Sequence, residues 1–240
     1  MNNRIEKLIT LGREVDIEIN DNQAEKLIGY MDRLLEKNKH INLTRITDED
    51  EFIKLHILDS LTLLKTIKNP QANILDVGTG GGFPGIPLAI LLEEAQITLM
   101  DSTRKKLSVV ESIAQELEIN NVKILHGRAE ELGQDFNYRE RYDVVTSRAV
   151  ANLTLLSEYC LPLVKVGGQF LSMKGRDYQE ELEAARRPIA VLGGKIVEIE
   201  KGLLLQSDYV HVIINVEKVK LTPDQFPRIN GKIKKEEFPV

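Results

Sequence analysis

One segment constrains the fold more than any other: a glycine-rich turn that follows a short apolar run and opens a helix. Residues 74–85 read Ile-Leu-Asp-Val-Gly-Thr-Gly-Gly-Gly-Phe-Pro-Gly. Glycine lacks a Cβ atom, so the backbone can turn sharply and approach a ligand closely. Pro84 suits the first turn of a helix. Such a cluster can be no more than a tight turn, but at the carboxyl end of a strand it is typical of a ligand-binding α/β protein.

From residue 70 onward the hydrophobic pattern alternates between strands and helices. The predicted elements are strands over 73–77, 96–100, 122–125, 142–146 and 168–173, with helices over 84–94, 104–117, 153–159 and 178–191. This alternation predicts a parallel sheet covered by helices on both faces. Two last strands, 195–199 and 209–216, are joined by a short connection and predict an antiparallel end. A seven-stranded, mostly parallel sheet of this kind is the Rossmann-like class I methyltransferase fold.

The chain before this alternation reads as helix. Apolar residues spaced by one, three and four positions predict helices over 21–39 and 48–67, with a weaker one over 5–13. We therefore divide the chain into an N-terminal helical region, 1–68, and a cofactor-binding domain, 69–240, that ends in a basic segment.

The glycine spacing favours S-adenosylmethionine over a dinucleotide as the cofactor. Gly78, Gly80 and Gly82 form the turn, but Phe83 stands where a dinucleotide fingerprint needs glycine or alanine. Asp76, just before the turn, is placed to fix the methionine end of the cofactor by orienting the loop or through water.

Two later strand ends supply the other expected cofactor contacts. Asp101 ends the second strand, 23 residues after Gly78, where a carboxylate can accept both ribose hydroxyls. It can equally cap the next helix together with Ser102 and Thr103. The loop after the third strand, residues 127–130, is expected to pass the adenine ring.

The segment after the fourth strand, residues 146–150, limits the chemistry. It contains neither Asn-Pro-Pro-Tyr nor Pro-Cys, and Cys160 lies beyond the next helix, so covalent attack on a pyrimidine is not expected. Cys160 is interpreted as a core residue. An acceptor with its own lone pair, such as guanine N7, needs only proximity and alignment. Arg148 is a candidate to bind the cofactor carboxylate or a phosphate, or to form a structural salt bridge.

Composition narrows the class of protein. The net charge of −5 excludes a broad cationic surface, so any nucleic-acid contact must use a local patch. A single cysteine excludes an intrachain disulfide and favours a reducing, cytoplasmic location. We expect no signal peptide, no membrane span, no metal site and a monomer.

Several segments together resemble the RsmG (GidB) family, the bacterial ribosomal RNA small-subunit methyltransferase G. The matching pieces are Asn42-Leu43-Thr44, His56-x-x-Asp59-Ser60, the glycine turn, Asp101-Ser102 with Lys105-Lys106, residues 126–130, Ser147-Arg148-Ala149, Gly167-Gly168, Met173-Lys174-Gly175 and Phe226-Pro227-Arg228. One departure lies in the tail, where Lys232 and Ile233 follow Gly231 although family members often have a proline at the second place.

The resemblance implies transfer of a methyl group from S-adenosylmethionine to N7 of a guanine in the 530 loop of 16S ribosomal RNA. The substrate is the RNA itself or the small ribosomal subunit. By position, the resemblance places Gly78 and Phe83 at the methionine end, Asp101 at the ribose, Ala129-Glu130 at the adenine, and Arg148 where cofactor and acceptor meet.

Basic residues supply the candidate RNA contacts. Six lie between positions 218 and 235, and the RNA-binding candidates are His56, Lys174, Arg228, Lys234 and Lys235. These basic residues can also be solvated surface without an RNA partner. His56 can equally be a residue that packs between helices. The alternatives are a small-molecule methyltransferase or another RNA methyltransferase, an NAD-linked oxidoreductase, or a binding protein that kept the fold without catalysis.

Overall fold

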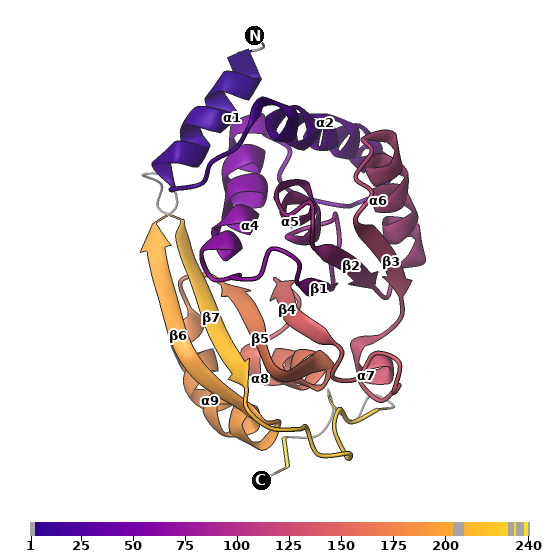
Figure 1. The fold of residues 1–240 in the computed structure, drawn as a ribbon, viewed down its shortest axis with the longest axis vertical. Coiled ribbons are helices and arrows are strands. Elements are labelled where there is room, and N and C mark those ends of the chain that lie inside the picture. Colours follow the sequence, from indigo (N-terminus) through magenta and orange to yellow (C-terminus); the bar gives the residue numbers. More distant parts are fainter. Residues whose placement is uncertain (1–2, 204–208, 230–232, 234–237, 240) are drawn as a thin grey trace.

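The computed structural model describes residues 3–203, 209–229, 233 and 238–239, and its centre is a seven-stranded sheet (Figure 1). The strand order is β3-β2-β1-β4-β5-β7-β6. The strands are β1 (Asn73–Val77), β2 (Gln96–Asp101), β3 (Val122–His126), β4 (Tyr142–Arg148), β5 (Val164–Lys174), β6 (Gly194–Leu203) and β7 (Val210–Lys218).

The first five strands are parallel, and β7 is antiparallel to both of its neighbours, β5 and β6. The predicted mostly parallel sheet with an antiparallel end is therefore confirmed. The reversed strand, β7, lies one position inside the edge of the sheet. It folds back from β6, the edge strand, and pairs between β6 and β5.

Helices cover both faces of the sheet (Figure 1). They are α1 (Asn3–Glu14), α2 (Asp21–Asn38), α3 (Glu49–Phe52), α4 (Asp59–Leu61), α5 (Gly85–Leu91), α6 (Arg104–Glu116), α7 (Ala129–Leu132), α8 (Leu153–Cys160) and α9 (Tyr178–Val191). The predicted helix over 48–67 is helical but not uniform. Between α3 and α4 it widens into a π-helical turn, Ile53–Leu58, and it ends in a 3₁₀ turn, Thr62–Lys65. Such π-turns frequently mark functional sites.

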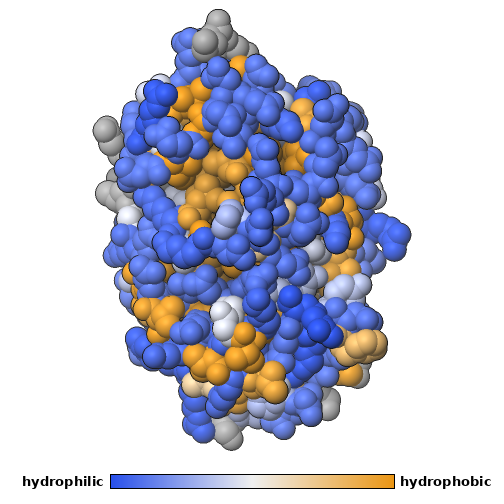
Figure 2. All heavy atoms as spheres, viewed as in Figure 1, coloured by the Kyte–Doolittle hydropathy of each residue, from blue (hydrophilic) through white to orange (hydrophobic). Residues whose placement is uncertain are grey.

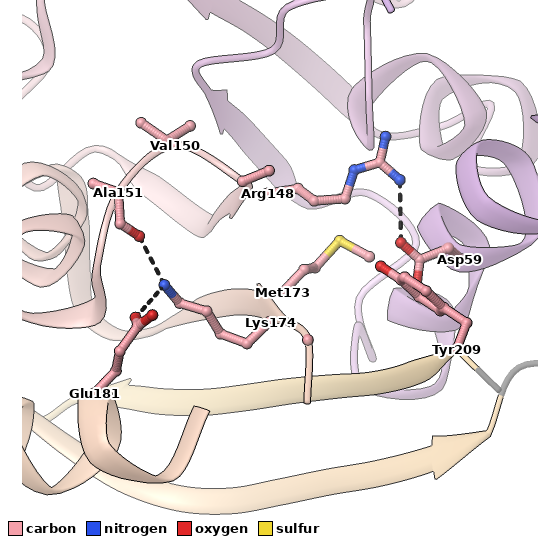
Figure 3. A pocket seen from close by; sticks show the side chains of 10 residues that line it. Asp59, Arg148, Val150, Ala151, Met173, Lys174, Glu181 and Tyr209 are labelled. Atoms are coloured by element: carbon pink, nitrogen blue, oxygen red, sulfur yellow. Dashed lines mark hydrogen bonds and ion pairs between the residues drawn. The ribbon is translucent and has the colours of Figure 1, made fainter. Parts of the chain in front are cut away.

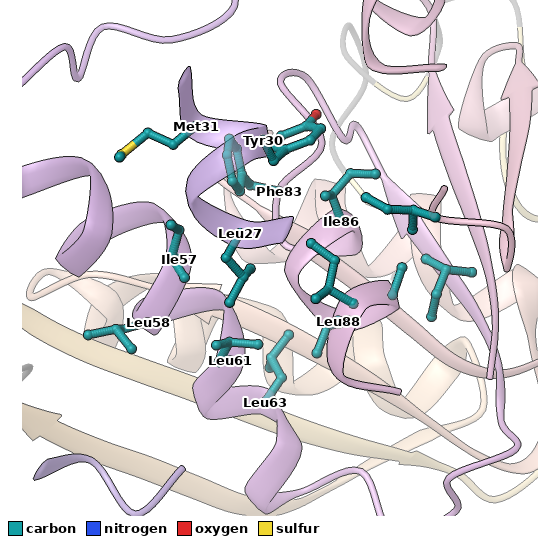
Figure 4. Packing of buried hydrophobic residues seen from close by; sticks show 14 of the residues in the cluster. Leu27, Tyr30, Met31, Ile57, Leu58, Leu61, Leu63, Phe83, Ile86 and Leu88 are labelled. Carbon is teal, nitrogen blue, oxygen red and sulfur yellow. The ribbon is translucent and has the colours of Figure 1, made fainter. Parts of the chain in front are cut away.

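The N-terminal helical region shares one hydrophobic core with the sheet. Side chains from α2 and from the segment 49–65 pack with α5 (Figure 4). The labelled members of this core include Leu27, Met31, Ile57, Leu61, Phe83 and Leu88. A second core on the other face joins α8 and α9 to β4, β5 and β7 and contains Cys160, as predicted.

A polar contact also ties the helical region to the glycine turn. The buried Tyr30 hydroxyl, on α2, donates a hydrogen bond of 2.9 Å to the carbonyl oxygen of Gly81. The Tyr30 ring also packs edge-on against Phe83. Helix α2 therefore supports the loop from behind, and its own start is secured by a capping box between Asn20 and Gln23.

We predict that Tyr30→Phe lowers the free energy of unfolding by about 1–2 kcal/mol, because the buried Gly81 carbonyl loses its donor. Denaturant unfolding measures this, with Tyr138→Phe, at a half-buried tyrosine, as the control. Equal stability of Tyr30→Phe and the unchanged protein would contradict the prediction.

Candidate cofactor and acceptor site

The glycine turn is held from beneath by Asp76, the penultimate residue of β1. Its Oδ2 atom accepts hydrogen bonds from Thr79 Oγ1 at 2.7 Å and from the Gly85 backbone N–H at 2.9 Å. Burial raises the pKa of Asp76 to about 6, although these two hydrogen bonds and the nearby Arg148 charge oppose the rise. Its Oδ1 atom is buried without a hydrogen-bond partner among the described residues. Asp76 thus holds the loop in place, and its effect on the methionine end of a cofactor stays a prediction.

Asp101, at the end of β2, accepts backbone hydrogen bonds with both carboxylate oxygens, and its contact with ribose hydroxyls stays a prediction. Its Oδ1 accepts the Thr103 backbone N–H at 2.8 Å, next to the start of α6. Its Oδ2 accepts the Gly80 backbone N–H at 3.0 Å. Gly80 has a φ of +56°, and a Cβ built there would meet only the Gly78 carbonyl oxygen at 3.9 Å. The loop therefore needs glycine at 80 for its conformation and presents open space at that point.

A cavity of about 700 Å³ lies between this loop and the N-terminal helical region. We call it the cofactor cavity. Its size is within the usual range for small-molecule sites. Of the residues predicted from sequence, it is lined by Gly78, Gly80, Phe83, Asp101, Arg148 and His56. The glycine turn, Asp101 and Arg148 are thus brought to one place.

Three further cofactor candidates, Ser102, Ala129 and Glu130, are not among the lining residues of this cavity. Ser102 is exposed after β2, and Ala129 begins the short helix α7, which the sequence did not predict. Glu130 is 5% exposed and accepts a hydrogen bond of 2.9 Å from Arg128 Nε. Their contact with an adenine ring stays a prediction.

Arg148 ends β4 and is held by residues from the helical region. Its Nη1 donates to the Leu55 carbonyl oxygen at 2.7 Å and to Asp59 Oδ2 at 3.1 Å. Its Nη2 lies 2.7 Å from His56 Nδ1. The side chains of Arg148 and Asp59 are only 13% and 2% exposed. Removing one member of this pair would be destabilising, because the other charge would be left buried and unpaired.

The arginine is the centre of a longer polar chain. His211 Nδ1, on β7, lies 2.7 Å from Asp59 Oδ1. At the other end, His56 Nε2 lies 2.6 Å from Thr44 Oγ1. We call the series Thr44–His56–Arg148–Asp59–His211 the polar chain. It connects the loop after α2, the π-helical turn, β4 and β7.

The protonation state of His56 follows from its partners. Burial and the Arg148 charge lower the pKa of His56 to about 3, so the ring is neutral at physiological pH. Nδ1 must accept from the guanidinium, so Nε2 carries the proton and donates it to Thr44. The ring is stacked on Phe83, with centroids 4.5 Å apart and an interplanar angle of 7°. His56 is therefore a positioned wall of the cavity rather than a general base.

A second cavity, of about 380 Å³, adjoins the first (Figure 3). It shares Arg148, Ala149 and Tyr209 with the cofactor cavity. It also contains Lys174, at the end of β5, whose ammonium contacts Glu181 and the Ala151 carbonyl oxygen, each at 2.7 Å. The predicted RNA-binding lysine is thus engaged inside the protein, and its RNA contact stays a prediction.

The C-terminal candidates lie farther from the cavities or outside the described residues. Arg228 forms a two-pronged ion pair with the buried Glu158, at 2.9 Å from Nε to Oε1 and 2.7 Å from Nη2 to Oε2. Lys234 and Lys235 lie outside the described residues. Of the tail departure, Gly231 and Lys232 also lie outside them, whereas Ile233, at the place of the family's proline, is buried in the second core.

Four site residues were missed from the sequence. Asp59 had a weak signal: it follows His56 by three positions on an otherwise apolar helical segment. Tyr209 and His211 had none, because their places in the site depend on contacts with distant parts of the chain. Glu181 had none either, although it follows its partner Lys174 by only seven positions.

Comparison with known proteins places the chain in a family. A family model described as GidB, rRNA small subunit methyltransferase G, matches residues 23–206. A ribosomal RNA small subunit methyltransferase G of Clostridium novyi (strain NT) is 46% identical over 218 residues, covering 90% of both chains. Another, of Alkaliphilus oremlandii (strain OhILAs), is 47% identical over 224 residues, covering 92% of this chain and 93% of that one. The chain belongs to the rRNA small subunit methyltransferase G family.

Solved structures agree with this family's fold class. A SAM dependent methyltransferase from Aquifex aeolicus superposes with a TM-score of 0.55 at 16% identity, covering 76% of this chain and 97% of that one. TrmN from Thermus thermophilus gives 0.53 at 18% identity, covering 68% of this chain and 48% of that one. The predicted class I methyltransferase fold is confirmed. Within the part of the chain that the structure describes, no helix is long and apolar enough to cross a membrane.

The raised pKa of Asp76 predicts a pH dependence of stability. The native carboxyl binds its proton up to about pH 6, whereas the unfolded one releases it near 3.8, so the unfolding free energy falls as pH rises between these values. Asp76→Asn removes this titration. We expect the stability of the unchanged protein, relative to Asp76→Asn, to fall by about 1–3 kcal/mol from pH 4 to pH 7. Denaturant unfolding across this range measures it, and parallel curves would contradict it.

Proposed function

We propose that this protein transfers a methyl group from S-adenosylmethionine to N7 of a guanine in the 530 loop of 16S ribosomal RNA. The observation that carries the proposal is the junction at Arg148. There, a cavity lined by the glycine turn and Asp101 meets a second cavity suited to an acceptor. Membership of the rRNA small subunit methyltransferase G family supports the RNA substrate.

The residues present fit the cofactor. The glycine turn leaves room for close approach, Asp101 offers a carboxylate for ribose hydroxyls, and Arg148 faces the cavity with a charge for a carboxylate group. S-adenosylmethionine supplies an electrophilic methyl group on a positively charged sulfur. Asp76 keeps the loop in shape through its hydrogen bonds to Thr79 and Gly85.

Methyl transfer to guanine N7 needs no general base from the protein. Guanine N7 carries a lone pair and no proton, so no base has to remove one before methyl transfer. The chain then contributes proximity, alignment and exclusion of water. The state of His56 supports this reading, since both of its ring nitrogens are engaged and its pKa is far below neutrality.

RNA contact in this proposal uses a local basic patch. Arg104 and Lys105 are exposed at the start of α6, and Lys106 lines the cofactor cavity. Lys174 and Arg228 have acidic partners in the structure, so RNA phosphates would compete with Glu181 and Glu158 for them. The exposed cluster at 104–106 therefore joins the predicted RNA-binding residues as a candidate for phosphate contacts.

Methyl transfer from labelled S-adenosylmethionine tests the proposal. The substrates are small-subunit RNA and small-subunit particles, each lacking the modification, and reduction followed by aniline cleavage maps 7-methylguanosine. We expect label at one guanine in the 530 loop, and the better substrate shows whether RNA or particle is recognised. Binding of the cofactor without any incorporation would overturn the target, and small-molecule acceptors would then be tried.

We predict that Arg148→Lys lowers kcat/KM for methyl transfer by about 100-fold, because lysine keeps the charge but loses the planar, multiple hydrogen bonding. Calorimetry with S-adenosylmethionine separates weakened cofactor binding from slower transfer. Thermal unfolding confirms that the variant is folded, and a folded variant with unchanged kcat/KM would exclude a role for Arg148 at the junction.

A further inference from the structure

The second cavity contains a donor and an acceptor held side by side. Lys174, from the carboxyl end of β5, and Glu181, from the first turn of α9, form an ion pair of 2.7 Å on the wall of this cavity. In Figure 3 this pair lies at one end of the cavity and the Arg148–Asp59 pair at the other, with Met173 between them. The Arg148 end borders the cofactor cavity.

The pair has hydrogen-bonding capacity left over. Glu181 Oε2 accepts from Lys174 Nζ and, at 2.8 Å, from the Leu153 backbone N–H. Its Oε1 has no hydrogen-bond donor among the described residues. The Lys174 ammonium has three protons, and Glu181 and the Ala151 carbonyl oxygen occupy two acceptor directions. One carboxylate oxygen and one ammonium proton thus remain for a ligand.

This pattern matches one edge of one base. Guanine carries an N1–H donor next to the O6 acceptor, whereas adenine carries an acceptor at N1 next to an amine. A carboxylate next to an ammonium is therefore complementary to guanine and repels adenine at both positions. With N1–H and O6 engaged, N7 is left free on the adjacent edge of the ring.

We propose that Glu181 and Lys174 select the target guanine by binding its N1–H and O6 atoms, and that this orients N7 toward Arg148 and the methyl donor. The inference rests on the proposed function and adds the residues that would determine base specificity. It also gives Lys174, one of the RNA-binding candidates from sequence, a contact with the target base.

The variant Glu181→Gln tests this with a clear direction. The Leu153 N–H and Lys174 Nζ both donate to one oxygen, so the glutamine amide must turn its oxygen toward them. Its NH₂ group then occupies the place of Oε1 and faces guanine N1–H, donor against donor. 2-Aminopurine has an acceptor at N1, no oxygen at C6 and an intact N7, so it avoids this clash.

The experiment measures kcat/KM for methylation of small-subunit particles carrying either guanine or 2-aminopurine at the target position. We expect the unchanged protein to prefer guanine, and Glu181→Gln to reduce that preference by about 10- to 100-fold. The difference in N7 reactivity between the two bases is the same for both proteins and cancels. Glu180→Gln removes the same charge from the neighbouring, exposed position on α9 and should keep the original preference.

The outcomes separate the two proposals. Equal losses on both bases in Glu181→Gln would show that Glu181 only supports the fold, and would overturn the inference while leaving the proposed function intact. Failure of the unchanged protein to methylate guanine in any small-subunit substrate would overturn the proposed function itself.

Discussion

The guanidinium of Arg148 is the interaction on which the rest of this site depends. A largely buried charge is tolerated only when it is paired and hydrogen-bonded, and here Asp59, His56 and the Leu55 carbonyl oxygen meet that need. All three partners come from the helical segment before the sheet. The N-terminal region is therefore part of the site as well as part of the core, and the π-helical turn that carries Leu55 and His56 sets where the arginine can be held.

Two consequences follow from this anchoring. His56 is fixed as a neutral ring between Arg148 and Thr44, which stacks it on Phe83 and closes one side of the cofactor cavity. The guanidinium also lies 5.4 Å from the centre of the Phe83 ring, so the phenylalanine that excludes a dinucleotide fingerprint packs against the charge at the junction. In the proposed function, cofactor selection and acceptor orientation would thus share the same few side chains.

Features that depend on neighbouring residues could be predicted from the sequence, whereas contacts between distant residues could not. Strands with clear apolar runs were located well, and β1 begins and ends where its pattern indicated, at 73–77. The start of β5 was placed four residues late, because Gly167 and Gly168 interrupt the pattern after Val164. The glycine turn with Asp76 is one contiguous motif and Asp101 ends a clear strand, so a local pattern was enough to nominate them as site candidates.

The contacts that could not be predicted join distant parts of the chain. Arg148 and Asp59 are 89 positions apart, and Asp59 and His211 are 152 apart. No local periodicity encodes such pairs. The same limit applies to charge: a lysine or arginine in the sequence does not reveal that Glu181 or Glu158 will meet it in the fold, so basic residues read from sequence overstate the free positive surface.

The most direct test is a crystal structure of the protein with S-adenosylhomocysteine, the demethylated form of the proposed cofactor. The account predicts density in the cavity beside the glycine turn, with the ribose at Asp101, the amino-acid end near Gly78, and the sulfur facing the junction at Arg148. Density elsewhere, or a sulfur pointing away from the cavity that holds Lys174 and Glu181, would contradict it.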